Sequence, residues 1–138
     1  MSNKDRVDSL LEVEKILEDL REKNKTVPIV VEGIRDKESL RKLEIKGKII
    51  IVNRGITLSD FCDQLSMKYS EIIILTDWDR KGGKICSIII KSLAGRTRCD
   101  IEIRKRFAQH TTIKNVEELP SWIENMKMKM GKKNTLRL

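Results

Sequence analysis

The sequence predicts an α/β fold in three layers, in which a four-stranded, mainly parallel sheet lies between two layers of helices. Three observations support this prediction. Short runs of branched apolar residues, such as Lys48–Val52 and Glu71–Thr76, are typical of buried strands. They alternate along the chain with amphipathic segments long enough to form the helical crossovers that parallel strands need. A chain of 138 residues can also bury one real core.

The first half of the chain predicts two helices and two strands. Residues 5–23 carry apolar side chains at helical spacing among charged ones, which indicates an amphipathic helix. The apolar run Thr26–Val31 predicts the first strand, and Arg35 to about Leu43 a short helix. Lys48–Val52 predicts the second strand, and the turn Asn53–Gly55 ends it.

The second half repeats this alternation. Thr57 or Ser59 can cap a helix that runs to about Tyr69. The elements expected after it are the strand Glu71–Thr76, a helix from Lys81 to about Leu93, a fourth strand Cys99–Ile103, a loop, and a helix from about Val116 to Met130. Residues 131–138 are expected to be frayed.

The sequence indicates one domain over residues 1–138, located in the cytoplasm. No apolar run approaches the length of a membrane span, and the N-terminus does not begin a signal peptide, so no membrane partner is expected. The three cysteines Cys62, Cys86 and Cys99 have no C-x-x-C spacing, which favours reduced, mostly buried thiols over metal ligands or a disulfide.

The positive charge of the chain is concentrated near its C-terminus. The net charge is +8, and residues 104–138 contribute +6 of it, from nine Lys and Arg against three Asp and Glu. A basic C-terminal segment suggests a polyanionic partner, most simply nucleic acid. The alternative is a solvated lysine-rich surface on a protein rich in Lys, Glu and Ile.

Three carboxylates follow two of the predicted strands. Glu32 comes directly after the first strand, and Asp77 and Asp79 come after the third. In a doubly wound sheet these two strands are neighbours, so their carboxyl ends meet at the edge where ligands bind. Crowded carboxylates repel one another unless a cation lies between them, and oxygen ligands of this kind suit Mg²⁺ or Mn²⁺.

Two segments together resemble the Toprim domain. They are V-E-G-I-R-D, which contains Glu32, and T-D-W-D-R-K-G-G, which contains Asp77 and Asp79. That Rossmann-like domain is shared by primases, type IA and type II topoisomerases, overcoming-lysogenization-defect nucleases and the ribonuclease that matures 5S ribosomal RNA. The resemblance covers about residues 25–105, flanked by the helix 5–23 and a basic helical extension, 104–138. In length and N-terminal helix the chain is most similar to small stand-alone archaeal members.

The resemblance implies a role for each matching residue. Glu32 matches a glutamate thought to move a proton or to help hold metal, and Asp77 and Asp79 match the pair that coordinates Mg²⁺. Gly33 and Gly82 match glycines that allow close approach of backbone or substrate. Asp36 matches an acidic position of the primase and ribonuclease branches, and is equally well explained as a carboxylate favoured by a helix N-terminus.

Two sets of basic residues are candidates for binding a nucleic-acid backbone. Arg80 and Lys81 directly follow the aspartates, and Arg104, Lys105 and Arg106 follow the fourth strand near the same edge. For both sets, plain solvation is the alternative. Trp78, between the aspartates, is expected to pack in the interior rather than to stack on a base.

The favoured function is Mg²⁺-dependent phosphodiester chemistry on RNA or DNA, with hydrolysis preferred to primase-like nucleotidyl transfer because water is the simplest nucleophile. One alternative is a nucleic-acid-binding or assembly module without turnover. Another is a haloacid-dehalogenase-type phosphatase, which usually carries its aspartate pair on the first strand. Large Toprim enzymes depend on accessory domains, so this module is expected to work alone, as a homo-oligomer or within a larger nucleic-acid-processing assembly.

Overall fold

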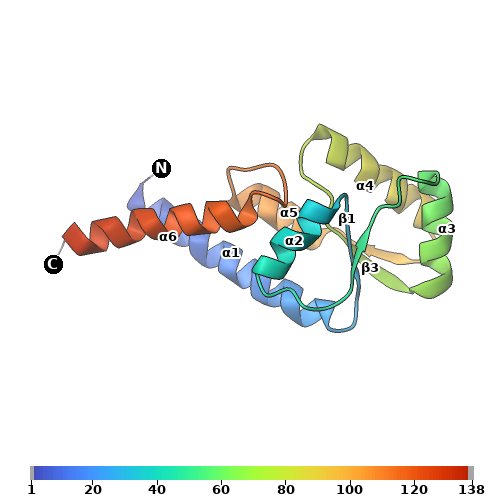
Figure 1. Cartoon of the computed structure of the whole chain (residues 1–138), viewed down its shortest axis with the longest axis horizontal. Coiled ribbons are helices and arrows are strands. Elements are labelled where there is room, and N and C mark those ends of the chain that lie inside the picture. Colours follow the sequence, from blue (N-terminus) through green and yellow to red (C-terminus); the bar gives the residue numbers. More distant parts are fainter. Residues whose placement is uncertain (1, 137–138) are drawn as a thin grey trace.

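In the computed structural model, which describes residues 2–136, one sheet is covered by helices on both faces (Figure 1). The four strands are β1 (Ile29–Val31), β2 (Ile49–Ile51), β3 (Glu71–Ile74) and β4 (Arg98–Asp100). They lie in the order β2-β1-β3-β4, and every neighbouring pair runs parallel. The chain leaves β1 toward one side to form β2 and returns to the other side to form β3, so the topological switch point lies between β1 and β3. The predicted α/β fold is confirmed.

Side chains that alternate along each strand divide the interior into two apolar clusters. Ile29 and Val31 of β1 face one cluster, and Val30 between them faces the other. The first cluster is covered by α1 (Asn3–Asn24), α2 (Ile34–Lys42), α5 (Glu102–His110) and α6 (Leu119–Leu136). The second is covered by α3 (Leu58–Lys68) and α4 (Arg80–Leu93). Both faces of the sheet are therefore buried, which explains why its strands are continuous apolar runs rather than alternating ones.

The helix α5 was not expected from the sequence. The segment Cys99–Ile103 was predicted as a strand and the following residues as a loop, but β4 ends at Asp100 and a helix begins at Glu102. The Asp100 side chain accepts a hydrogen bond from the backbone N–H of Glu102 (2.8 Å), which helps to start the helix. Ile103 and Phe107, one helical turn apart, are its two buried residues. Two apolar positions in a basic segment are a weak signal for a helix. The alternation of Ile101 and Ile103 also matched the two-residue period of a strand.

The last helix also differs from its predicted bounds. It begins at Leu119 rather than Val116, and it continues past Gly131 to Leu136, where fraying was expected. Residues 137 and 138 lie outside the described part of the chain. Thr57, one of the two caps proposed for α3, is the one used: its hydroxyl accepts a hydrogen bond from the N–H of Asp60 (3.0 Å).

The helices α1 and α6 form a long antiparallel pair that extends beyond the sheet (Figure 1). The start of α1 and the end of α6 lie at the same end of the molecule. Leu10, Val13 and Ile16 of α1 are buried in the same cluster as Trp122 and Met126 of α6, and Lys127 pairs with Glu14 at 3.3 Å. No helix within residues 2–136 combines the length and the apolar character that crossing a membrane requires.

Candidate functional site

Glu32 and Asp77 meet at the carboxyl edge of the two central strands. Glu32 directly follows β1, and Asp77 lies three residues beyond the end of β3. The backbone N–H of Asp77 donates a hydrogen bond to Oε2 of Glu32 at 2.8 Å. Glu32 is 7% exposed, so its carboxylate is held against the edge of the sheet rather than in solvent. The two strand ends therefore lie side by side, as predicted, while the sharing of one cation by Glu32, Asp77 and Asp79 stays a prediction.

The Asp77 side chain is anchored by a segment from the far end of the chain. Its Oδ1 accepts a hydrogen bond from the backbone N–H of Val116 at 3.1 Å. The neighbouring Trp78 reinforces this contact, because its backbone N–H donates to the carbonyl of Lys114 (2.9 Å) and its indole N–H to that of Ile113 (2.6 Å). The α5–α6 connection therefore lies over the loop between β3 and α4 and fixes its path.

Asp77 is surrounded by more negative charge than the protein compensates. Burial, together with the negative charges of Asp36, Glu32 and Asp79, raises the pKa of Asp77 to about 7, although the hydrogen bond from Val116 N–H opposes the change. A nearby negative charge makes ionisation of a carboxyl group less favourable, so the group keeps its proton to a higher pH. Asp77 thus lies where a cation would be stabilising.

Asp79 begins the helix α4. It is exposed, and its Oδ1 accepts a hydrogen bond from the N–H of Gly82 at 2.7 Å, as an N-cap residue does. A side chain at Gly82 is excluded, because a Cβ there would lie 1.8 Å from the carbonyl oxygen of Asp77. Gly82 was expected to allow backbone or substrate to come close, and in the fold it allows α4 to pack against the backbone of Asp77. Gly33 is different: the nearest atom to a Cβ there would be Oδ2 of Asp36 at 3.9 Å, so no protein atom demands glycine.

Asp36 lies behind Glu32, in the first turn of α2. Its Oδ2 accepts a hydrogen bond from the N–H of Gly33 at 3.0 Å, which is the helix-terminal role considered for it. It is 8% exposed, and burial is the main cause that raises its pKa. Glu32 and Glu117 raise the pKa of Asp36 further, while Gly33 N–H and the positive charge of Arg54 lower it. Asp36 adds to the negative charge around Asp77.

The chemistry of this set suits a hard divalent cation. Glu32, Asp77 and Asp79 each use one oxygen to accept a backbone N–H, and the second oxygen of each accepts no hydrogen bond from any described residue. Carboxylate oxygens are the ligands that Mg²⁺ and Mn²⁺ prefer. Across residues 2–136, however, no three acidic, histidine or cysteine side chains are already arranged around a common point that could hold a metal. The donors fit such an ion, and their side chains would turn to reach it.

The basic residues predicted at this edge have different surroundings. Arg104 donates from Nε to the carbonyl of Thr76 (3.0 Å) and from Nη2 to that of Asp77 (2.8 Å), so it supports the loop that carries the aspartate. Arg106 pairs with Asp19 of α1 at 2.8 Å. Lys105 is exposed on α5. Arg80 and Lys81 are exposed in the first turn of α4, directly after Asp79.

Two features of the site were not predicted. One is the Val116 N–H bound to Asp77, which lies in a segment without periodic pattern. The other is Arg54, in the loop between β2 and α3, whose charge acts on Asp36. The position of Arg54 after the second strand could have indicated this. Because β2 is parallel to its neighbour β1, the loop after β2 emerges at the same edge of the sheet as Glu32. Trp78 packs as expected, with its ring stacked on Phe107 at a centroid distance of 5.6 Å.

Comparison with known proteins agrees with this architecture. Residues 27–114 match the family model of the Toprim domain. A UPF0292 protein of Thermoplasma volcanium is 44% identical over 105 residues, covering 75% of this chain and 88% of the relative. A UPF0292 protein of Pyrococcus furiosus is 36% identical over 118 residues, covering 84% and 87%. A solved structure described as a putative protein from Aquifex aeolicus superposes with a TM-score of 0.67 at 25% identity, covering 77% of this chain and 96% of that one.

Proposed function

This chain belongs to the Toprim domain family and, within it, to the small UPF0292 proteins, and on that premise we propose that it is a Mg²⁺- or Mn²⁺-dependent nuclease. A Toprim domain suggests a metal-dependent function related to nucleic acid. The single observation that carries the finer proposal is the contact between Glu32 and the backbone of Asp77 (2.8 Å), beside carboxylates whose mutual repulsion favours a bound cation. The proposal includes a cytoplasmic location, where RNA and DNA are available as substrates.

The residues of the site have distinct roles in this proposal. Asp77 and Asp79, with Glu32, would hold the divalent ion, which when bound neutralises charge on the phosphoryl and leaving oxygens. Glu32 is the group that moves a proton to or from the reacting oxygens. Exposed Arg80 and Lys81 attract the phosphate backbone to the edge of the sheet. Arg104 acts through Asp77: its two hydrogen bonds keep the β3–α4 loop in place.

The test is cleavage of end-labelled single- and double-stranded RNA and DNA, with and without Mg²⁺ or Mn²⁺, by the wild type and Glu32→Gln. A glutamine keeps an oxygen that can accept the N–H of Asp77, so the fold is retained while the charge is lost. The expected loss of turnover is at least about 100-fold, the effect of removing a positioned acid or base. The matched control is Glu38→Gln, the same change on the exposed face of α2, which leaves the rate unchanged. Equal rates for Glu32→Gln and wild type contradict the proposal.

A second candidate is a binding or assembly module without turnover. The observation that favours it is that, within residues 2–136, no three carboxylates are arranged around a common point as the ligands of a metal would be. The same experiment separates the two. Retention of labelled nucleic acid that weakens steeply with salt, with no metal-dependent product, supports the binding module. Incorporation of nucleotides into longer products instead of shorter ones supports nucleotidyl transfer.

A further inference from the structure

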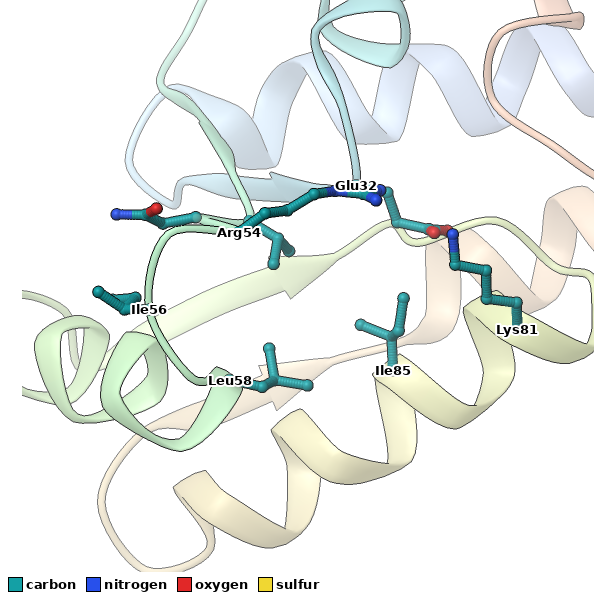
Figure 2. Close-up of a pocket in the computed structure, with 8 residues that line it drawn as sticks. Glu32, Arg54, Ile56, Leu58, Lys81 and Ile85 are labelled. Atoms are coloured by element: carbon teal, nitrogen blue, oxygen red, sulfur yellow. The ribbon is translucent and has the colours of Figure 1, made fainter.

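A pocket of about 300 Å³ opens next to Glu32, on the α3–α4 side of the sheet. It is bounded by the loop between β2 and α3 and by the first turns of α4 (Figure 2). Glu32 and Lys81, which lies in the first turn of α4, lie close together at one end of it. The pocket is therefore continuous with the proposed site, yet none of its other lining residues belongs to the carboxylate set.

The floor of the pocket is apolar. It is formed by Val52, Ile56, Leu58 and Ile85, all of which pack against the second core cluster and remain partly exposed. Four aliphatic side chains left uncovered beside a charged site form a surface on which a flat apolar group can lie. Burial of such a group there removes apolar area from water on both partners.

The rim of the pocket is basic. Arg54 and Lys81 extend over it toward Glu32 from opposite sides (Figure 2). Neither forms an ion pair with any residue that the structure describes within 2–136. Both are therefore available to an anionic group lying between them. Asn53 accepts the N–H of Gly55 with its Oδ1 (2.8 Å), and its amide NH₂ donates to no residue in the described part of the chain.

We propose that this pocket binds one unpaired nucleotide of the substrate, with its base and sugar on the aliphatic floor and its phosphate between Arg54 and Lys81 beside Glu32. This inference rests on the proposed nuclease function and adds the form of the substrate to it. A volume of about 300 Å³ is near the lower limit for ligand pockets and suits one nucleotide but not a base pair. A nucleotide that enters it has left the duplex or comes from a single strand. Asn53 NH₂ donates to an acceptor on the base edge, and the guanidinium of Arg54 pairs with the phosphate.

The first experiment measures mononucleotide binding by ¹H–¹⁵N NMR, with adenosine, guanosine, cytidine and uridine 5′-monophosphates and their deoxy forms as probes. Saturable shifts are expected at residues of the β2–α3 loop and the start of α4. Lys81→Ala is expected to weaken binding about tenfold, equivalent to about 1.4 kcal/mol. Its matched control is Lys91→Ala, which removes the same charge from the last turn of the same helix and leaves binding unchanged.

A second variant fills the pocket. Leu58→Trp, at the first residue of α3, is expected to abolish mononucleotide shifts while its circular dichroism spectrum matches the wild type. Arg54→Ala, in an exposed loop, provides the same test should the tryptophan disturb folding. Shifts located elsewhere, no saturable shifts with millimolar mononucleotide, or binding indifferent to all three pocket variants overturns the inference.

Cleavage assays separate this inference from the function on which it rests. If both hold, single-stranded oligonucleotides are cut faster than blunt duplexes, and Leu58→Trp removes that preference. If the nuclease function holds without the pocket, Glu32→Gln abolishes cleavage whereas Leu58→Trp changes neither rate nor strand preference, which overturns the pocket inference alone. Mononucleotide binding at the pocket with no metal-dependent product supports the pocket and contradicts the nuclease.

Discussion

Glu32 accepts a hydrogen bond from the backbone of Asp77, a residue 45 positions later in the chain. The contact joins the ends of two adjacent parallel strands, so it is a property of the fold and not of local sequence. It places an acidic side chain beside a carboxyl group whose pKa is raised to about 7 by burial and by neighbouring carboxylates. The predictions below follow from this concentration of charge and from the contacts that maintain it.

Asp77→Asn is expected to stabilise the metal-free protein at neutral pH. An asparagine keeps an oxygen that can accept the Val116 N–H, and it removes a charge that Asp36, Glu32 and Asp79 repel. Thermal unfolding in chelator should therefore occur at a higher temperature than for wild type. Addition of Mg²⁺ should raise the midpoint of the wild type and much less that of the variant. A wild type indifferent to Mg²⁺ and Mn²⁺ contradicts a metal at this site.

The same carboxyl group gives a pH dependence of defined sign. Its pKa in the folded state, about 7, lies above the ordinary value of 3.8 for an aspartate, so between these values the folded state binds more protons than the unfolded state. Without metal, the contribution of Asp77 to stability is therefore greatest below 3.8, falls as the pH rises toward 7, and is constant above. Subtracting the unfolding free energies of Asp77→Asn from those of wild type, measured by urea titration across this window, isolates the slope. A difference that is flat, or that rises with pH, refutes the sign.

Gly82→Ala and Gly83→Ala are adjacent changes in α4 with opposite expected effects. A Cβ at Gly82 would meet the backbone of Asp77 at 1.8 Å, so the loop or the helix must shift, at a cost of about 1–3 kcal/mol. A Cβ at Gly83 would meet Nη2 of Arg104 at 3.6 Å, an ordinary contact, and alanine favours the helix by about 0.5–1 kcal/mol. Chemical denaturation measures both. Equal destabilisation by the two alanines would show that helix propensity, not the approach to Asp77, decides.

Arg104→Ala is expected to act through the loop rather than through substrate binding. The substitution removes two hydrogen bonds to the carbonyls of Thr76 and Asp77, which are among several contacts that hold the β3–α4 loop in place. It should lower the free energy of unfolding by about 1.5–3 kcal/mol. Its neighbour Lys105 is exposed, so Lys105→Ala should leave stability unchanged and reduce the salt dependence of nucleic-acid binding. Unfolding and filter-binding measurements at several salt concentrations distinguish the two. The reverse pattern contradicts these assignments.

The cysteines are expected to react slowly with thiol reagents in the folded protein. Burial raises the pKa of Cys99 to about 11 and also raises the pKa values of Cys62 and Cys86. The thiolate is the reactive form, so labelling at mildly alkaline pH should be far slower than for a small thiol and should accelerate on unfolding. Labelling with a chromogenic disulfide, in buffer and in denaturant, measures this. Rapid labelling of the native protein contradicts it.

The sequence predicted those parts of the site that are set by the ends of regular elements. Glu32 and Asp77 were brought together by the rule that neighbouring parallel strands end at the same edge, and buried runs such as Ile72–Leu75 identify strands clearly. The position of Val116 N–H could not be predicted, because the segment that carries it has no periodic pattern and its path depends on α5. That helix was itself obscured, since Ile103 and Phe107 alone carry its buried face.

The contacts that individual basic side chains make could not be predicted from the sequence either. Arg104 was expected to guide nucleic acid, and in the fold its guanidinium is engaged by two carbonyls. Arg54 was passed over as part of a turn, and it faces the pocket beside Glu32 (Figure 2). In both cases the residue type was visible, and the tertiary neighbours that decide its role were not.

The antiparallel course of α1 and α6 has a practical consequence. One helix starts where the other finishes, and this tip projects away from the sheet. An affinity tag or surface tether joined at either extremity is therefore remote from β1 and β3, whose carboxyl ends lead to Glu32 and Asp77 (Figure 1). Immobilised protein would then present its acidic edge to solution with unhindered access. Single-molecule recordings of nucleic acid arriving at that edge could use both attachment routes interchangeably, each serving as a check on the other.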